Sequence, residues 1–115
     1  MPYDASRHGP HRIVGPGFHE QVHALVRTVP SGSVTTYGDL GAQLGSKSVA
    51  RHVGYAMAGV PEGSDVPWWR VVAAGGRLSQ DEAAAAEQAE RLREEGLEVV
   101  GVRIRRFDRH RHVFP

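Results

Sequence analysis

Glycine and proline residues divide this chain into short segments, and this punctuation limits what the chain can fold into. The breaks fall at residues 30–32, Gly45, residues 59–61, residues 75–76 and Gly96. Before the first break, helical spacing predicts a helix that begins near Gly17 and buries one apolar face, made by Phe18, Val22, Leu25, Val26 and Val29. After a β-prone stretch at residues 34–36, a second helix is expected from Tyr37 to about Leu44. A third is expected through Ala58, with Ser46 or Ser48 as its N-cap.

The second half of the chain alternates turn signals with β-prone and helical stretches. Residues 68–79 alternate weakly around Gly75-Gly76, which suggests a hairpin or a wing. Asp81 is expected to cap a long helix that runs to Glu95 and ends at Gly96. Strand-like positions follow at Leu97, Val99, Val102 and Ile104. Three helices with a tight turn between the second and third, followed by a hairpin, predict a mostly α, winged helix-turn-helix domain with a small β hairpin.

The length of 115 residues corresponds to one domain. Residues 1–16 are rich in Pro, Gly and His without periodicity, so we expect a flexible N-terminal arm. The folded domain is expected over residues 17–104, and residues 105–115 are expected to form a basic C-terminal tail.

Composition excludes several classes of protein. The chain has no cysteine, so it has no disulfide, no thiolate zinc site and no thiol nucleophile. A net charge of +1 with 40% hydrophobic residues predicts neither disorder nor a strong polyanion partner. No run approaches the roughly 18 apolar residues of a membrane span, and no secretory signal is recognisable. We therefore expect a soluble, cytoplasmic protein without a membrane partner.

Charge is nevertheless sorted along the chain. Residues 81–98 carry seven acidic side chains against Arg91 and Arg93, whereas residues 99–115 carry five arginines against Asp108 alone. Such an arginine cluster is typical of phosphate contacts and equally of a solubilising tail. Both interpretations remain open.

One motif resembles a zinc site. Residues 19–23 read HEQVH, which fits the pattern in which two histidines one helical turn apart bind zinc and a glutamate acts as base. A catalytic zinc site needs a third protein ligand, and none follows at a recognisable spacing. The same helix uses Phe18, Val22 and Val26 for the core, so His19 and His23 are expected on its solvated flank, and no metal is assigned.

The stretch 32–79 carries the most specific signal. It contains Pro-x-Gly-x-Val-x-Thr-Tyr-Gly at residues 30–38, Ala-Arg-x-Val-Gly-x-Ala-Met at residues 50–57, and Val-Pro-x-x-Arg-Val-Val at residues 66–72. With the Glu95-Gly96 pair, these motifs make residues 17–100 resemble the DNA-binding domain of O6-alkylguanine-DNA alkyltransferases.

The chain departs from that family at the reactive position. The family reads Pro-Cys-His-Arg, and its cysteine accepts the alkyl group; this chain reads Pro67-Trp68-Trp69-Arg70. Indole is neither a nucleophile nor a base, so no residue is left to perform alkyl transfer. The pattern resembles that of the alkyltransferase-like proteins, which bind alkylated bases without repairing them, although members often keep the histidine that Trp69 replaces.

The resemblance implies DNA-binding roles for four residues. Small Ala50 and Gly54 let the third helix approach a minor groove. Arg51 matches the arginine that fills the hole left by an extruded nucleotide, and Tyr37 matches the tyrosine that helps to rotate this nucleotide out.

The resemblance also implies a lesion pocket made by Trp68, Trp69, Arg70 and Val71, in which the main-chain carbonyls of Trp68 and Val71 match acceptors for the guanine amino group. Two adjacent tryptophans cannot easily face one core, so at least one is expected to line the pocket or to lie in the wing. No catalytic residue and no cofactor is assigned.

These expectations describe a non-enzymatic, monomeric, nucleoid-associated protein that binds O6-alkylguanine in duplex DNA by minor-groove helix insertion and base flipping. The resemblance implies that it flags lesions for nucleotide excision repair proteins. The alternative is a winged-helix transcription regulator of undamaged DNA, which needs polar base-reading side chains on the third helix, where Ala50, Gly54, Ala56 and Ala58 stand.

Overall fold

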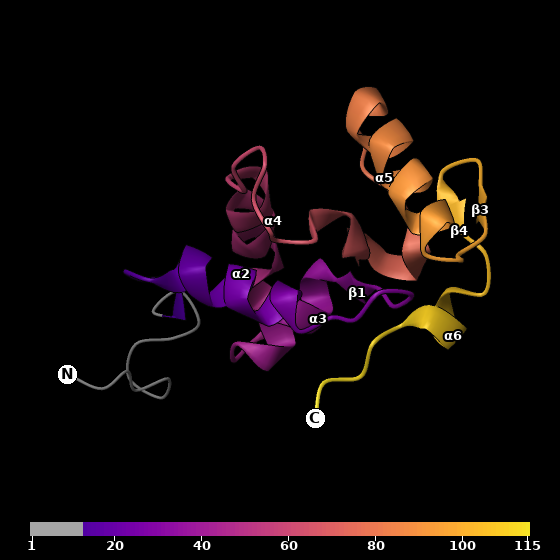
Figure 1. Cartoon of the computed structure of the whole chain (residues 1–115). Helices are drawn as coiled ribbons and strands as arrows, with labels where there is room; N and C mark the ends of the chain where they lie inside the picture. The colour runs from indigo at the N-terminus through magenta and orange to yellow at the C-terminus, as the bar shows by residue number, and fades with distance from the viewer. Residues whose placement is uncertain (1–12) are drawn as a thin grey trace.

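The N-terminal half of the chain forms a helix-turn-helix around one apolar cluster (Figure 1). The computed structural model describes residues 13–115. Helix α2 (Phe18–Arg27) packs against α4 (Ala50–Ala58), and α3 (Tyr37–Gln43) packs against both. The cluster consists of the buried side chains of Phe18, Val22, Val26, Leu40, Val49, Val53, Ala56, Val66 and Val71. The apolar spacing of the sequence therefore identifies the packed faces of these helices.

The turn between α3 and α4 is tightly built. The Ser46 hydroxyl accepts a hydrogen bond from the Ser48 amide at 3.1 Å, and this caps a short 3-10 turn, η2 (Lys47–Val49). The third helix therefore begins later than the sequence predicts, because Ser46 caps the 3-10 turn and not α4 itself. A Cβ on Gly41 would lie 2.9 Å from the Ser46 carbonyl oxygen, so the close approach of α3 to this turn requires glycine.

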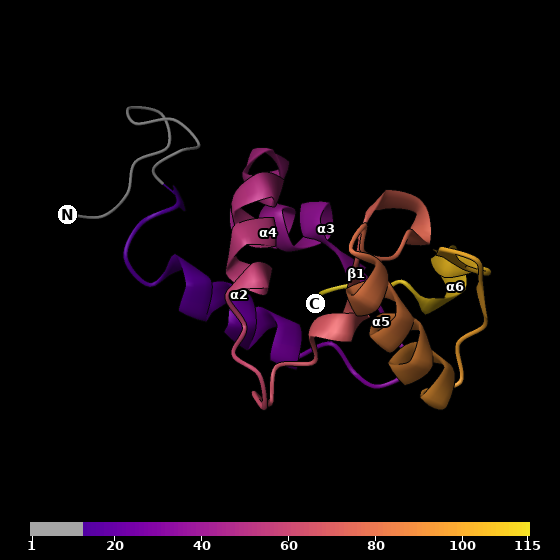
Figure 2. The same cartoon turned by 90° about the horizontal axis from the view of Figure 1, so that it is seen from above.

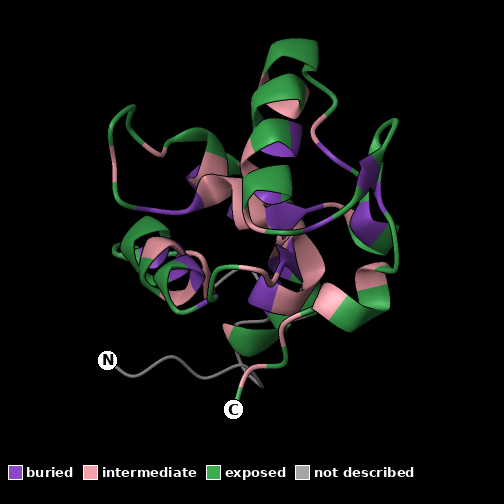
Figure 3. Cartoon of the chain, turned by 45° about the vertical axis from the view of Figure 1, so that its right-hand side comes forward, coloured by how far each residue is buried: buried purple, intermediate pink, exposed green. Residues whose placement is uncertain are grey.

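A second apolar cluster holds the C-terminal half together. It lies beneath α5 (Glu82–Glu94), whose N-terminus is capped, as expected, by the Asp81 carboxylate accepting from the Ala84 amide. Its buried residues come from the segment between β2 (Val71–Val72) and α5 (residues 73–80, called the wing below), from α5, and from the strands and the residues beside them. They are Val34, Val72, Leu78, Ala89, Leu92, Leu97, Val99 and Ile104. Seen from above, α2 and α4 lie on one side of the molecule and α5 and α6 (Phe107–His110) on the other (Figure 2). Buried residues gather where these elements meet, and exposed ones cover their outer turns (Figure 3).

The strand pairing differs from the expected hairpin over residues 68–79. After the 3-10 turn η3 (Trp68–Arg70), strand β2 (Val71–Val72) pairs in parallel with β1 (Thr35–Thr36), far away in sequence. Only one antiparallel bridge, Ala73 to Arg77, closes the wing turn, because η4 (Ala74–Gly76) takes a 3-10 path with Gly75 and Gly76 at positive φ. The small antiparallel hairpin lies further along, between β3 (Val99–Val100) and β4 (Arg103–Ile104).

Residues 105–115 lie against the domain. The Val34 amide donates to the His110 carbonyl at 2.8 Å, and the His112 amide donates to the Val34 carbonyl at 2.7 Å. The Arg111 guanidinium forms two hydrogen bonds with Asp39 of α3, at 2.6 and 2.8 Å, and holds the pKa of that carboxyl below its ordinary value. The segment expected as a tail is therefore joined to β1 and α3.

At the other end, most of the expected N-terminal arm, residues 1–12, lies outside the described residues. Ile13 and Val14 pack against the first apolar cluster. Over residues 13–115, the helices are too short and too polar for any of them to cross a membrane.

Two helical glycines should respond oppositely to alanine substitution. Gly41→Ala should destabilise the fold by about 1–3 kcal/mol, because its methyl group overpacks against the Ser46 carbonyl. Gly54→Ala should stabilise it by up to about 1 kcal/mol, because a Cβ there meets nothing within 4 Å and alanine is the better helix former. Urea unfolding of both variants checks this pair; a stabilising Gly41→Ala would contradict the close packing of the turn.

Candidate nucleic-acid interface

Two cavities meet at Trp68. The first, the Tyr37 cavity, has a volume of about 290 Å³ and is lined by residues of α3, α4, η3, β2, the wing and α5, namely Tyr37, Gly54, Met57, Ala58, Trp68, Val71, Ser79, Ala84 and Gln88. It brings together four residues that the sequence assigns separately to DNA or lesion contacts, namely Tyr37, Gly54, Trp68 and Val71.

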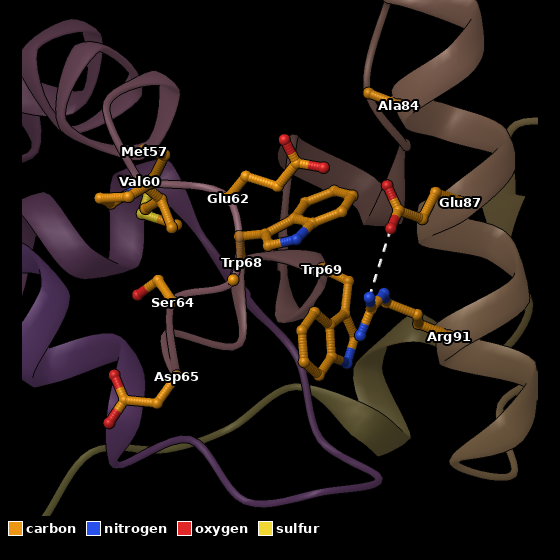
Figure 4. Close-up of a pocket in the computed structure, with 12 residues that line it drawn as sticks. Met57, Val60, Glu62, Ser64, Asp65, Trp68, Trp69, Ala84, Glu87 and Arg91 are labelled. Carbon is orange, nitrogen blue, oxygen red and sulfur yellow. Dashed lines mark hydrogen bonds and ion pairs between the residues drawn. The ribbon is translucent and has the colours of Figure 1, made fainter.

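The second cavity, the Arg91 cavity, has a volume of about 540 Å³ and lies between the loop after α4 and the face of α5 (Figure 4). Trp68 and Trp69 form its floor, and Glu62, Asp65, Glu87 and Arg91 supply charged groups at its walls. The half-buried Trp68 indole therefore lines both cavities and separates them.

Trp69 is held in one orientation. Its indole N–H donates to the Glu95 carboxylate at 2.8 Å, and the guanidinium carbons of Arg70 and Arg91 lie 5.4 and 4.5 Å from its ring centroid. The ring also packs against the second apolar cluster. Trp68 and Trp69 meet edge to face, with ring centroids 6.1 Å apart. The expectation that the two adjacent rings do not share one core environment matches this arrangement.

Arg70 lies away from both cavities. Its guanidinium donates to the Glu95 carboxylate, at 2.7 Å for the shortest bond, and to the Val29 carbonyl at 2.9 Å. The Arg70 and Glu95 side chains are only 16% and 11% exposed, so this is a nearly buried ion pair. The structure thus places Arg70 behind the predicted lesion pocket, where it supports Trp69 and does not face a bound base.

Glu95 is the acceptor on which this arrangement depends. Burial raises the pKa of its carboxyl, but hydrogen bonds from Arg70, Trp69 and the Gly32 amide outweigh burial and hold the pKa below its ordinary value. The carboxylate is therefore charged at neutral pH. Through these hydrogen bonds, Glu95 connects the C-terminal end of α5 to Trp69 of the tryptophan pair and to Gly32 in the segment that follows α2.

Gln88 is a pocket residue that the sequence reasoning missed. Its side chain is 2% exposed, and its amide N–H groups donate to the Val71 and Trp69 carbonyls at 2.9 and 3.2 Å. Its amide oxygen accepts from the Ser79 amide at 2.9 Å. The signal was available in the helical spacing, since Gln88 shares the buried face of α5 with Ala85, Ala89 and Leu92. The Gln88 amide thus occupies one acceptor site of the Val71 carbonyl.

The outer face of α4 is open. Val53 and Ala56 are buried against α2, whereas Arg51 is exposed and Gly54 and the half-buried Ala50 stand beside it on the outward side. Tyr55, 57% exposed on the same side, was not predicted as a site residue. A Cβ at Gly54 would meet no other atom within 4 Å, so packing inside the described residues does not require glycine there.

The two histidines of the HEQVH motif, His19 and His23, lie on α2 close to each other, and His23 contacts α4. The ring nitrogen Nε2 of His23 lies 2.8 Å from the Ala56 carbonyl, a contact that ties α2 to α4. The His19 and His23 rings are neighbours, with centroids 6.5 Å apart. Within residues 13–115, no group of three histidine, aspartate or glutamate side chains lies close enough together to hold a metal ion.

The structure combines a helix-turn-helix, an open face of small residues on α4 and a tryptophan-lined cavity. These features are typical of a DNA-binding domain, and comparison with known proteins identifies its family. The sequence matches the family described as "6-O-methylguanine DNA methyltransferase, DNA binding domain" over residues 17–97. The chain belongs to this family.

Two relatives show which members of this family are similar to the chain. The chain is 39% identical over 82 residues to the DNA base-flipping protein of Vibrio parahaemolyticus, covering 71% of this chain and 82% of the relative. It is 39% identical over 84 residues to Alkyltransferase-like protein 1 of Schizosaccharomyces pombe, covering 71% and 78%.

A solved structure supports the same class. S. pombe Atl1 in complex with damaged DNA containing O6-carboxymethylguanine superimposes with a TM-score of 0.68 at 38% identity, covering 75% of this chain and 82% of that one. The resemblance to alkyltransferase-like proteins and the winged helix-turn-helix class, both predicted from the sequence, are confirmed.

The Glu95 contacts predict a specific pH dependence. Because the folded pKa of Glu95 lies below its unfolded value of about 4.3, its contribution is complete above that value and is lost as the pH falls through the folded pKa. Glu95→Gln should lower the free energy of unfolding by about 3–5 kcal/mol at pH 7, since it leaves Arg70 nearly buried without a counter-charge. On acidification, the free energy of unfolding of this variant should fall less than that of the wild type. Urea unfolding at pH 7 and at successive pH values below about 4.3 measures both effects, with the exposed Glu94→Gln as matched control. Equal acid losses in wild type and Glu95→Gln would refute the assignment.

Proposed function

We propose that this chain binds duplex DNA through the outer face of α4 and accepts a flipped O6-alkylguanine in the Tyr37 cavity, without transferring the alkyl group. The observation that carries the proposal is the convergence of Tyr37, Gly54, Trp68 and Val71 on one cavity. The damaged-DNA complex of the similar S. pombe Atl1 and the name of the V. parahaemolyticus relative support it.

The absence of alkyl transfer follows from the chemistry of the cavity wall. The chain has no cysteine, and Trp68 stands where the resemblance puts the alkyl acceptor. The neighbouring Trp69 uses its only N–H to donate to Glu95 and has no basic nitrogen to accept a proton. The thiol nucleophile of the family motif and its activating base are both replaced, so we expect binding without alkyl transfer.

The helix face fits insertion into a minor groove. That groove is only about 6 Å wide, so an α-helix can enter it closely only where its side chains are small or the groove is widened. Ala50, Gly54 and Ala58 supply such positions on the outward side of α4, and Arg51 beside them supplies a charged group long enough to enter a vacated base stack. The same small residues offer few hydrogen bonds for reading base edges, which disfavours a major-groove regulator.

The tryptophan wall offsets part of the cost of flipping. Extruding a base costs a few kcal/mol, and less for a damaged base. One base–aromatic stack returns roughly 1–3 kcal/mol. The indole of Trp68 presents an apolar face to the cavity and therefore favours an O6-alkyl group over the bare guanine carbonyl. The adjoining Arg91 cavity offers space for larger substituents.

The cellular part of the proposal rests on the family resemblance. The chain acts as a nucleoid-associated monomer, and its bound complex marks the lesion for nucleotide excision repair proteins. Analytical ultracentrifugation of the complex on a short duplex tests the stoichiometry.

The central experiment compares one duplex with and without a single O6-methylguanine. Wild-type protein should bind the lesion duplex more tightly, and a labelled methyl group should stay on the DNA. Trp68→Ala should reduce the lesion preference by roughly 1–3 kcal/mol and leave binding to the undamaged duplex nearly intact. Equal losses on both duplexes would make Trp68 a packing residue, and label on the protein would disprove the non-covalent mechanism.

The α4 face is tested by two variants with different physics. Arg51→Ala removes the group proposed to fill the vacated stack, and Gly54→Leu places a bulky side chain where open space now lies. Both should weaken binding to lesion and plain duplex alike, by tenfold or more, which is about 1.4 kcal/mol. Ala24→Leu, at an exposed position of α2, is the control for a bulky surface leucine. Unchanged affinity of Gly54→Leu would show that another element faces the DNA.

A further inference from the structure

An arginine pair crosses the boundary between the wing and the C-terminal hairpin. Arg77 lies in the wing, inside residues 17–97 matched by the family, and Arg103 lies in β4, beyond them. An antiparallel bridge joins the two residues, and the Leu78 amide donates to the Val102 carbonyl at 2.8 Å beside it. Directly opposed residues of an antiparallel pair project to the same side. Both guanidinium groups therefore leave the ribbon on one surface.

The Arg103 side chain reaches over the wing turn. A Cβ built on Gly75 would lie 3.1 Å from Nη1 of Arg103. The guanidinium thus lies against the backbone of the turn, within the space that the glycine leaves free. Arg77 and Arg103 together form what we name the arginine ridge.

The ridge carries uncompensated positive charge. Arg27, Arg70, Arg91, Arg105 and Arg111 each form an ion pair with a carboxylate. Among residues 13–115, no carboxylate pairs with Arg77 or Arg103, although both are exposed. Acidic groups near the two arginines in the chain act elsewhere, since Asp81 caps α5, Glu98 pairs with Arg105 and Asp108 acts on Arg111. Like charges directly opposite on a ribbon destabilise it, and an anion between them removes that repulsion.

The wing that carries Arg77 lies beside Tyr37 of the proposed DNA-binding face. A further cavity of about 320 Å³ is lined by Tyr37 and by the wing residues Ala73, Leu78, Ser79 and Gln80. The wing therefore lies directly beside Tyr37, which borders Gly54 of α4 in the Tyr37 cavity. Arg77 lies next to Leu78 in the chain and pairs with both Ala73 and Arg103, so the ridge begins one residue away from the wing residues that border Tyr37.

We propose that the arginine ridge is a second DNA contact, which binds the phosphate backbone beside the lesion and extends the DNA contact beyond the helix-turn-helix. The proposal rests on the proposed function for the identity of the polyanion. Arginine forks match phosphate oxygens in pairs. The ridge contacts no base, so it adds affinity that is independent of sequence and of the lesion.

The test is the salt dependence of binding by the full chain. Each phosphate contact contributes about 0.9 to the slope of log affinity against log salt on duplex DNA. The double variant Arg77→Gln/Arg103→Gln should lower the slope by about 1.8. When the salt concentration rises from 50 to 200 mM, the fold-loss in affinity of the double variant should therefore be about 12 times smaller than that of the wild type. Arg77→Lys/Arg103→Lys keeps both charges and should retain most of the slope.

The matched control is Arg27→Gln, an exposed arginine of α2 that pairs with Asp65, which should leave the slope unchanged. Thermal unfolding verifies that all variants fold. The ratio of lesion to plain-duplex affinity should stay at the wild-type value in the double variant. An unchanged slope in that variant overturns the ridge proposal, whatever the lesion preference. A wild type without lesion preference would instead refute the proposed function, while the slope comparison stays valid.

Discussion

The Glu95 carboxylate is the interaction on which the site depends. It accepts hydrogen bonds from Trp69, Arg70 and the Gly32 amide, and Arg70 in turn donates to the Val29 carbonyl. One group at the end of α5 thereby connects the second apolar cluster, through Trp69, with the segment that follows α2. A nearly buried ion pair of this kind is often no more stable than an apolar replacement, but a single member left without its partner is costly. The contribution of Glu95 is therefore mainly to enforce one arrangement of the tryptophan pair.

That arrangement determines what Trp68 can do. With Trp69 fixed by its hydrogen bond and by two flanking guanidinium groups, the neighbouring ring is left on the cavity side, almost perpendicular to it. Gln88 adds further support, because its side chain forms hydrogen bonds with the Val71 carbonyl and the Ser79 amide, two groups of residues that line the Tyr37 cavity. The cavity is thus shaped by polar groups that contact its walls, while the surface presented to a ligand is largely aromatic and aliphatic.

The sequence predicts local features of this fold well and long-range ones poorly. Helical spacing and glycine breaks locate α2, α3 and α5, because these signals depend on neighbours within one or two turns. The parallel pairing of Thr35–Thr36 with Val71–Val72 leaves no periodic signal in such short strands, so residues 68–79 resembled a hairpin. The motifs of the family resemblance identified Tyr37, Gly54, Trp68 and Val71. They gave no reason to expect that Arg70 points away from the cavity, because its partners lie 25 and 41 residues distant.

A non-covalent site divides the work of recognition between separate surfaces. A cysteine that accepts the alkyl group makes recognition irreversible, because sulfur binds the alkyl carbon and guanine is released as the leaving group, so weak initial binding suffices. An indole cannot do this, and the lifetime of its complex is limited by dissociation. In the proposed function, the lesion-dependent part of the affinity comes from the cavity around Trp68, where one stack supplies roughly 1–3 kcal/mol. This is too little to hold a protein on DNA, so the remainder must come from groups that bind any duplex. The exposed arginines at positions 51, 77 and 103 are suited to that role, since their charge acts on phosphate wherever the lesion lies.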